Sequence, residues 1–350
     1  MLAAGEKVEF RANLLEWFAQ HRRDLPWRRT RDPYAIWISE IMLQQTRVAA
    51  VIPYYERFLA RFPTFEALAS AAEAELLAQW AGLGYYYRAR NLQKAARRIR
   101  EHGAFPSSYE TIRDLPGVGD YTAAAVASIA FELPHAVLDG NVFRVLSRVY
   151  EDATNIASGA GRRRFAGLAD ELLDRARPGE FNQAVMELGA TICLPGNPQC
   201  LLCPVARWCR ARASGRQNEL PVKIVERKSV EEHRTVYWVE REGRVLAWQR
   251  NEESRLMPGF WELPEREQLP GAEAGRTLGW FRHGITFHSY RFDVVEAVAP
   301  REVGACEWVA LEKLAGMPVS TIFQKAKRVV DRSRAREKAG TAGQAAAGGG

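Results

Sequence analysis

The stretch 115–148 constrains this chain more than any other part of its sequence. It begins with the turn LPGVG, in which proline fixes one backbone φ angle, while the two glycines permit positive φ and a close approach to the backbone. An alanine-rich helix is predicted over 121–129, so the N–H groups of Gly117 and Gly119 lie at a helix N-terminus. Such a terminus favours an anion, and a phosphate is the expected ligand.

A carboxylate follows the same segment. Asp139 stands directly before the helical pattern of 142–146, which predicts that it caps that helix and that the helix dipole favours its charge. Taken alone, an aspartate at this position is most often only a cap, and a Gly-x-Gly turn before a helix is common. A carboxylate kept ionised beside a phosphate-binding turn nevertheless indicates chemistry on nucleic acid.

A second carboxylate lies in a strongly apolar helix. The helix predicted over 36–50 contains WISEIMLQQTRVAA, in which Glu40 has tryptophan, isoleucine and leucine neighbours. If Glu40 faces inwards, burial raises its pKa and makes it a candidate general acid, whereas the alternative is an outward glutamate on a polar face. Gln45 and Thr46 just beyond it could reach base edges or fill a gap in a duplex, or else be solvated.

Two other segments place aromatic side chains beside arginines. DLPWRR, at 24–29, ends the first predicted helix at proline, and its Trp27 and Arg28 could line a pocket for a flat ring, although packing is the commoner use. GLGYYYRAR, at 82–90, places Tyr85 after a glycine turn, where it could stack on a base. A core tyrosine with a wet hydroxyl is the alternative.

Four of the five cysteines fall within one loop, with the spacing Cys193-x6-Cys200-x2-Cys203-x5-Cys209. In a reducing compartment this crowding favours a metal or cluster over disulfides. The spacing favours a [4Fe–4S] cluster, whose thiolates come from a compact segment. Zinc is the less favoured alternative, because tetrahedral zinc sites usually use two Cys-x-x-Cys pairs and this loop has only one.

Composition and patterning suggest the partner and the domain organisation. A formal charge of +7 on 350 residues fits a polyanionic partner, and no apolar run or signal pattern indicates a membrane contact or export, so we expect a cytoplasmic protein. The chain is long enough for two cores. We expect domains at 8–214 and 235–330, an intervening linker at 215–234 and a disordered tail at 331–350, because the pattern changes from helical to alternating after the linker.

Together, the LPGVG turn, the aspartate of LDGNV and the cysteine loop resemble the helix-hairpin-helix DNA glycosylases of the endonuclease III superfamily. WISEIMLQQTRV, GLGYY, Tyr121 and the β-rich C-terminal region resemble the MutY-type adenine glycosylases within it. The resemblance implies a mainly α helix-hairpin-helix glycosylase domain with a [4Fe–4S] cluster loop, followed by an α+β Nudix-like C-terminal domain. The segment after MPGFWELP lacks the REx2E metal-binding helix, so Nudix hydrolysis is not expected.

The resemblance also implies catalytic roles. Glu40 would protonate adenine and Asp139 would stabilise the sugar cation, with pKa values shifted in opposite directions by an apolar neighbourhood and by a helix N-terminus. Tyr121 and Asn141 would orient the two carboxylates. Bifunctional relatives have a lysine at the position of Tyr121, and since a phenol cannot form their Schiff base, we expect excision without an efficient lyase step.

The implied substrate is double-stranded DNA with adenine opposite 8-oxoguanine or guanine, bound by a bacterial monomer that associates with the nucleoid. The residues expected to contact the DNA are Leu25, Trp27, Arg28 and Gln183 around the adenine, Gln45, Thr46 and Tyr85 within the duplex, Gly117 and Gly119 at the backbone, and Thr286 and His288 at the oxidised base. Two alternatives stay open: a bifunctional endonuclease III-like glycosylase/lyase, and a non-catalytic iron–sulfur DNA-binding protein.

Overall fold

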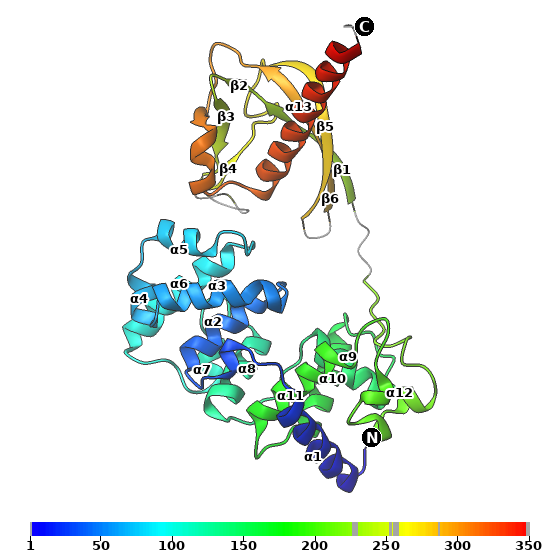
Figure 1. Ribbon diagram of the computed structural model, residues 1–350. Coiled ribbons are helices and arrows are strands. Elements are labelled where there is room, and N and C mark those ends of the chain that lie inside the picture. The colour runs from blue at the N-terminus through cyan, green and yellow to red at the C-terminus, as the bar shows by residue number, and fades with distance from the viewer. Residues whose placement is uncertain (1, 226–229, 252–253, 255–258, 286–287, 348–350) are drawn as a thin grey trace. The chain divides into compact units, whose positions relative to one another are not determined.

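The computed structural model describes residues 2–225, 230–251, 254, 259–285 and 288–347. The chain divides into two compact units, Met1–Val225 and Glu226–Gly350, which are coloured from blue to green and from yellow-green to red in Figure 1. No helix in these described ranges is long and apolar enough to cross a membrane.

The first unit is helical, as the sequence predicts. Its α-helices are α1 (Ala4–His21), α2 (Pro33–Leu43), α3 (Val48–Arg61), α4 (Phe65–Ser70), α5 (Glu73–Trp80), α6 (Tyr87–His102), α7 (Tyr109–Arg113), α8 (Asp120–Phe131), α9 (Gly140–Tyr150), α10 (Gly159–Leu172), α11 (Pro178–Thr191) and α12 (Arg210–Ala213). Three short 3-10 turns, η1 (Pro26–Arg28), η2 (Cys200–Leu202) and η3 (Ala206–Trp208), complete it.

Two hydrophobic cores organise these helices. One contains the side chains of α2, which is buried along nearly its whole length, together with those of α3 and α6. The other contains the apolar faces of α1, α9 and α11. The alanine-rich α8 contributes to both, since its small side chains let α2 and α11 approach it closely. α2 of one core and α11 of the other therefore pack against the same helix, α8.

The predicted helix 36–50 is wrong in one respect, because it is two helices. α2 ends at Leu43, Gln45 adopts a positive φ of 59°, and α3 begins at Val48. The buried guanidinium of Arg88 lies at this break and donates to the carbonyls of Ile41, Met42 and Gln44. These carbonyls would otherwise accept hydrogen bonds from the next turn of the helix, so Arg88 takes the place of that turn. Gln45 and Thr46 consequently lie on a loop and not on a helix face.

The second unit is an α+β domain. A sheet of order β1-β6-β5 pairs β1 (Val230–Trp238) in parallel with β6 (His288–Val298), which is antiparallel to β5 (Glu273–Ile285). In the second sheet, β3 (Arg244–Gln249) pairs with β2 (Glu240–Arg241), β4 (Trp261–Glu262) and β7 (Cys306–Ala310). The helix α13 (Thr321–Ala347) follows the turn η4 (Leu311–Gly316) and runs along β5 of the first sheet (Figure 1). It buries Phe323, Ala326 and Val330 in a core to which both sheets contribute.

Three boundaries differ from those expected from the sequence. β1 begins at Val230, inside the stretch assigned to the linker, because 230–234 pairs with His288–Phe292 of β6. Residues 215–225 belong to the first unit, where the N–H of Ile156 donates to the carbonyl of Val222 at 3.0 Å. Helix α13 continues to Ala347 through the expected disordered tail, since alanine, arginine and lysine favour helix.

Candidate active site

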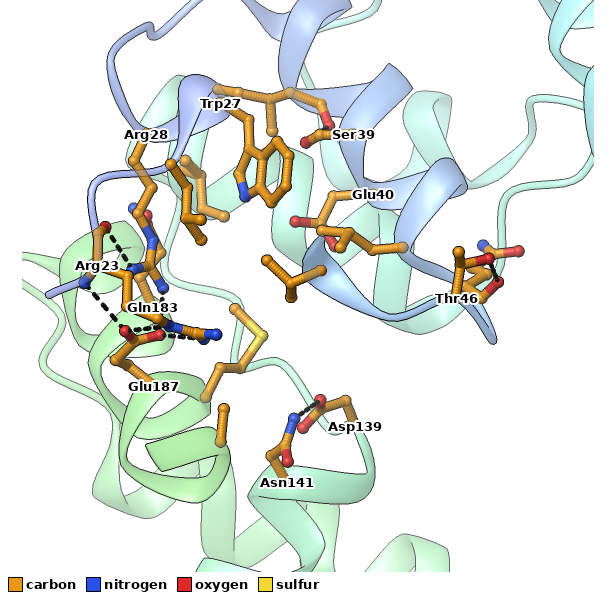
Figure 2. Close-up of a pocket in the computed structure, with 18 of the residues that line it drawn as sticks. Arg23, Trp27, Arg28, Ser39, Glu40, Thr46, Asp139, Asn141, Gln183 and Glu187 are labelled. Atoms are coloured by element: carbon orange, nitrogen blue, oxygen red, sulfur yellow. Dashed lines mark hydrogen bonds and ion pairs between the residues drawn. The ribbon is translucent and has the colours of Figure 1, made fainter. Parts of the chain in front are cut away.

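A pocket of the first unit lies where its two cores meet. Its volume is about 510 Å³, and side chains from η1, α2, α8, α9 and α11 line it. Figure 2 shows Glu40 and Asp139 reaching the same open space from α2 and from the start of α9. The predicted site residues that line this pocket are Leu25, Trp27, Arg28, Glu40, Gln45, Thr46, Tyr121, Asp139, Asn141 and Gln183.

Glu40 faces inwards, as its apolar neighbours predict. Its side chain is buried, with 5% of its surface exposed, and the hydroxyl of Tyr121 donates to its Oε2 at 2.7 Å. Burial raises the pKa of Glu40 to about 7, although the hydrogen bond from Tyr121 opposes that rise. Glu40 is therefore poised to hold and release a proton near neutral pH.

Asp139 caps α9 as predicted. Its Oδ1 accepts from the backbone N–H of Val142 at 2.7 Å, and its Oδ2 accepts from Nδ2 of Asn141 at 2.8 Å. The predicted direction of its pKa is wrong. Burial raises the pKa of Asp139, and the hydrogen bonds from Val142 and Asn141 only offset part of that rise. Both carboxylates are thus shifted upwards, because the pocket removes water from both.

A chain of hydrogen bonds runs from Asp139 towards the cysteine loop. Arg144 donates from Nη2 to Oδ1 of Asn141 at 2.8 Å and from Nε to the carbonyl of Cys193 at 2.6 Å. Gly189 closes this arrangement, because its carbonyl accepts from Arg144 at 2.7 Å and a Cβ at that position would lie 2.6 Å from Cβ of Asn141. The start of α9 is therefore fixed by α11 as well as by its own cap.

A buried ion-pair cluster forms the opposite wall of the pocket. The carboxylate of Glu187 on α11 is fully buried and accepts from Arg23 at 2.7 Å and from Arg28 at 2.8 Å (Figure 2). Burial alone would raise the pKa of Glu187, but the hydrogen bonds from the two arginines outweigh it and hold that pKa at about 2. The cluster fixes Arg28 beside Trp27, whose ring packs edge-on against Tyr55.

Neither Glu187 nor Gly189 was identified from the sequence. Within a helical pattern a glutamate and a glycine give no local sign of a site, and the partners of Glu187 are 164 and 159 residues away along the chain. The nearest sign in the sequence is the pair Arg23 and Arg28 beside the Pro26-Trp27 turn, which indicates a need for a buried carboxylate partner.

The residues expected to enter or contact DNA lie on exposed loops. Gln45 is exposed on the loop after α2, with Thr46 half-buried beside it, and Tyr85 is 51% exposed with a positive φ of 49°. Gly117 and Gly119 are exposed in the turn before α8, whose first turn has no side-chain cap. The N–H groups there are available to an anion. Gly117 needs its positive φ of 80°, and a Cβ would lie 2.7 Å from Asn91.

The four cysteines gather beside α9. Burial raises the pKa of Cys203 to about 12, and the thiols of Cys193, Cys209 and Cys200 add to that rise. Arg148 donates to Sγ of Cys193 at 3.2 Å. Four cysteine thiols, one of which accepts a hydrogen bond from Arg148, are a ligand set of the kind that holds an iron–sulfur cluster. No group of three His, Cys, Asp or Glu side chains in the described ranges is arranged to hold a single metal ion.

In the second unit, His288 lies at the start of β6. Its Nδ1 lies 2.6 Å from Oε1 of Glu232, and its ring stacks on Tyr290 with centroids 5.7 Å apart. Thr286, the other residue expected to read the opposing base, falls outside the described residues. Residues 266–268, where a Nudix hydrolase would need its metal-binding helix, form a turn.

Comparison with known proteins relates this geometry to DNA repair. Residues 38–167 match the model of the HhH-GPD superfamily base excision DNA repair proteins. A solved thermostable thymine-DNA glycosylase is similar to part of this chain, with a TM-score of 0.55 and 32% identity over 60% of this chain and 98% of that one. The range 38–167 that matches the family model includes Glu40, the hairpin before α8 and Asp139.

Two curated relatives extend the comparison. The human adenine DNA glycosylase is 50% identical over 62% of this chain, and the matched part spans 42% of that protein's length. The mouse adenine DNA glycosylase is 36% identical over 96% of this chain and 81% of its own length, so the similarity includes both units. The chain belongs to the adenine DNA glycosylase family of the helix-hairpin-helix superfamily.

Proposed function

We propose that this protein acts in base excision repair, where it releases adenine from DNA mispairs by hydrolysing the N-glycosidic bond. The observation that supports this most is the pairing of Glu40 and Asp139 in one pocket, each with its own hydrogen-bond donor. Cleavage of a glycosidic bond through an oxocarbenium-like state needs an acid at the leaving group and a carboxylate near the sugar. The pocket holds both.

The two carboxylates have different parts in this reaction. Glu40, with a pKa of about 7, donates a proton to N7 of adenine and so makes the base a better leaving group. Asp139 accepts two hydrogen bonds that stabilise its ionised form, and it stabilises the positive charge that develops on the sugar. Tyr121 orients Glu40, and Asn141 orients Asp139.

Adenine must leave the base stack to reach this pocket, at a cost of about a few kcal/mol. Leu25 and Trp27 provide the apolar surface for the flat ring, while Arg28 and Gln183 provide polar atoms for its edge. An amide such as that of Gln183 both donates and accepts, which matches the adjacent amino group and ring nitrogen of adenine. A pyrimidine would leave part of this surface empty.

The rest of the DNA contacts follow from the exposed loops. Gln45 and Thr46 fill the gap that the adenine leaves, and Tyr85 stacks beside the opposing base. The turn with Gly117 and Gly119 binds a phosphate through its N–H groups. The second unit, as a Nudix-like module without hydrolase activity, reads 8-oxoguanine through Thr286 and His288. The preferred substrate is adenine opposite 8-oxoguanine, followed by adenine opposite guanine.

We also propose a [4Fe–4S] cluster held by Cys193, Cys200, Cys203 and Cys209. When bound, the cluster shapes the loop that approaches DNA and takes no part in bond cleavage. The chain's own groups already link this loop to the active site, since Arg144 joins Cys193 to Asn141. The protein works as a monomer in the bacterial cytoplasm and associates with the nucleoid through DNA.

The proposal is tested with duplexes that carry adenine opposite 8-oxoguanine, guanine or cytosine. With enzyme in excess, free adenine is measured by chromatography over time. Release that is fastest opposite 8-oxoguanine supports the proposed substrate, whereas equal release from all three duplexes refutes recognition of the opposing base. No release from any of them refutes the glycosylase activity itself.

The lyase alternative has its own test. A bifunctional enzyme forms a Schiff base that borohydride reduces to a stable protein–DNA adduct. Tyr121 provides no amine, so we expect no efficient trapping under conditions in which adenine is released. Trapping in proportion to adenine release would contradict the monofunctional mechanism.

A further inference from the structure

One buried cation joins two loops that are far apart in the sequence. Arg88 on α6 is only 2% exposed. Its Nη1 donates to the carbonyls of Ile41 at 2.9 Å and Met42 at 3.2 Å, and also to that of Gln44. Its Nη2 donates to the carbonyls of Leu83 and Gly84, both at 3.2 Å. The guanidinium therefore binds the end of α2 on one side and the loop before α6 on the other.

Both of these loops contain an exposed residue with a strained backbone. Gln45 follows Gln44 with a φ of 59°, and Tyr85 follows Gly84 with a φ of 49°. Left-handed backbone at a residue other than glycine persists only when its surroundings fix it. Arg88 binds the carbonyl directly before each of the two strained residues, so one side chain contacts both loops at the point of strain.

The burial of the Arg88 guanidinium costs folding free energy, so stability alone does not explain its position. Burial lowers its pKa, and the charges of the Tyr87 and Tyr85 phenols oppose that shift. Its guanidinium lies 5.4 Å from the ring centroids of both Trp80 and Tyr85. Arg88 forms no ion pair with a carboxylate among the described residues, and a buried cation of this kind is weak evidence for a stabilising role, since apolar residues fill a core at lower cost.

Other contacts join the same two loops to their surroundings. Nε1 of Trp80 donates to the carbonyl of Gly84 at 3.0 Å. The side chain of Gln44 donates to Oγ1 of Thr122 at 3.2 Å, in the first turns of α8. Arg88 thus occupies the centre of a network that connects the exposed loops to α2, the helix that contains Glu40.

We propose that Arg88 is a positioning residue that couples the Gln45 loop to the Tyr85 loop, so that the two enter the duplex as one unit in register with Glu40. This inference rests on the proposed function, in which both loops contact DNA. It adds that their contributions to binding are interdependent and that the interdependence passes through one guanidinium. Neither loop would keep its conformation alone.

A double-mutant cycle tests this coupling directly. Gln45→Asn and Tyr85→Asn each remove one proposed DNA contact, and asparagine is chosen because it tolerates left-handed backbone. The two substitutions are made singly and together, both in the wild-type protein and in Arg88→Lys. The measured quantity is the Kd for a duplex whose adenosine bears 2′-fluorine and resists cleavage. In the wild-type background we expect the change in Kd of the double variant to differ by about fivefold from the product of the changes in Kd of the two single variants, as is found for residues in one network.

In the Arg88→Lys background the same cycle should become multiplicative, because one ammonium cannot span both loops. A wild-type cycle without coupling, or coupling that is unchanged in Arg88→Lys, would overturn the proposal. Arg97→Lys is the matched control, since Arg97 lies on the same helix and also donates to a carbonyl, that of Ala69 at 3.2 Å. It should leave the coupling intact.

A second measurement needs no change at Arg88. Amide hydrogen exchange of 44–46 is compared between the wild-type protein and Tyr85→Asn, both bound to the uncleavable duplex. Faster exchange in the variant supports the coupling, and unchanged exchange contradicts it. Because these measurements use binding and not excision, a failure of the wild type to release adenine would refute the proposed function separately.

Discussion

Removal of one hydroxyl should change the pH at which the enzyme stops working. In Tyr121→Phe, Glu40 loses the 2.7 Å hydrogen bond that stabilises its ionised form. A hydrogen bond to a charged group contributes about 1.5–3 kcal/mol. At 1.36 kcal/mol for each pKa unit, its loss raises the pKa of Glu40 by about one to two. The pKa would thus move from about 7 to about 8–9.

The sign of the effect on rate follows from the role of Glu40. A general acid works while it is protonated, so the rate of the wild type should fall as pH rises through about 7. In Tyr121→Phe the fall should occur at a higher pH, even if the maximal rate is lower because Glu40 is less well oriented. A substitution that only loosens the fold would lower the rate without moving this limb upwards.

The assay is adenine release with enzyme in excess, followed from about pH 5.5 to about pH 9.5. Tyr109→Phe is the matched control, because the hydroxyl of Tyr109 donates to Asp120 at 3.3 Å on an exposed surface. Its pH profile should equal that of the wild type. An alkaline limb in Tyr121→Phe that stays in place, or that moves to lower pH, would refute the assignment of Glu40 as the acid.

Three further predictions follow from the surrounding contacts. Glu187→Gln should lower the free energy of unfolding in urea at neutral pH by about 3 kcal/mol, at the low end for a broken buried pair because Arg23 is 39% exposed. Since the pKa of Glu187 is held at about 2, below its ordinary 4.5, this difference should narrow as pH falls from 4.5 towards 2, and a constant difference would contradict it. Gly189→Ala should slow adenine release by about tenfold or more, because its methyl group displaces Asn141, and an unchanged rate would show that the packing is unimportant. Cys200→Ser should lose the visible absorption of an iron–sulfur cluster and most of its DNA affinity, whereas a colourless, zinc-loaded wild type would refute the cluster.

The sequence predicts those parts of the site whose signals are local. The turn before α8 is evident from its proline and glycines, and the cap at Asp139 from its place before a helical pattern. The burial of Glu40 is evident from the apolar residues on every side of it. These features depend on residues that are neighbours along the chain, so a single segment is enough to infer them.

The features that could not be predicted depend on distant partners. The helix 36–50 breaks because Arg88, more than forty residues away, takes the carbonyls at its centre. The pKa of Asp139 rises because other helices bury it, which a cap alone does not reveal. The role of Glu187 depends on Arg23 and Arg28, from the other end of the first unit's sequence.

The central claim is that Glu40 and Asp139 together cleave the bond to adenine. The most direct measurement is adenine release, with enzyme in excess, from a duplex with adenine opposite 8-oxoguanine by the wild type, Glu40→Gln and Asp139→Asn. Asparagine can still cap α9, so the fold and DNA binding should persist in Asp139→Asn. We expect each substitution to slow release by about a hundredfold or more while leaving Kd within about threefold. Release at the wild-type rate by either variant would contradict the mechanism.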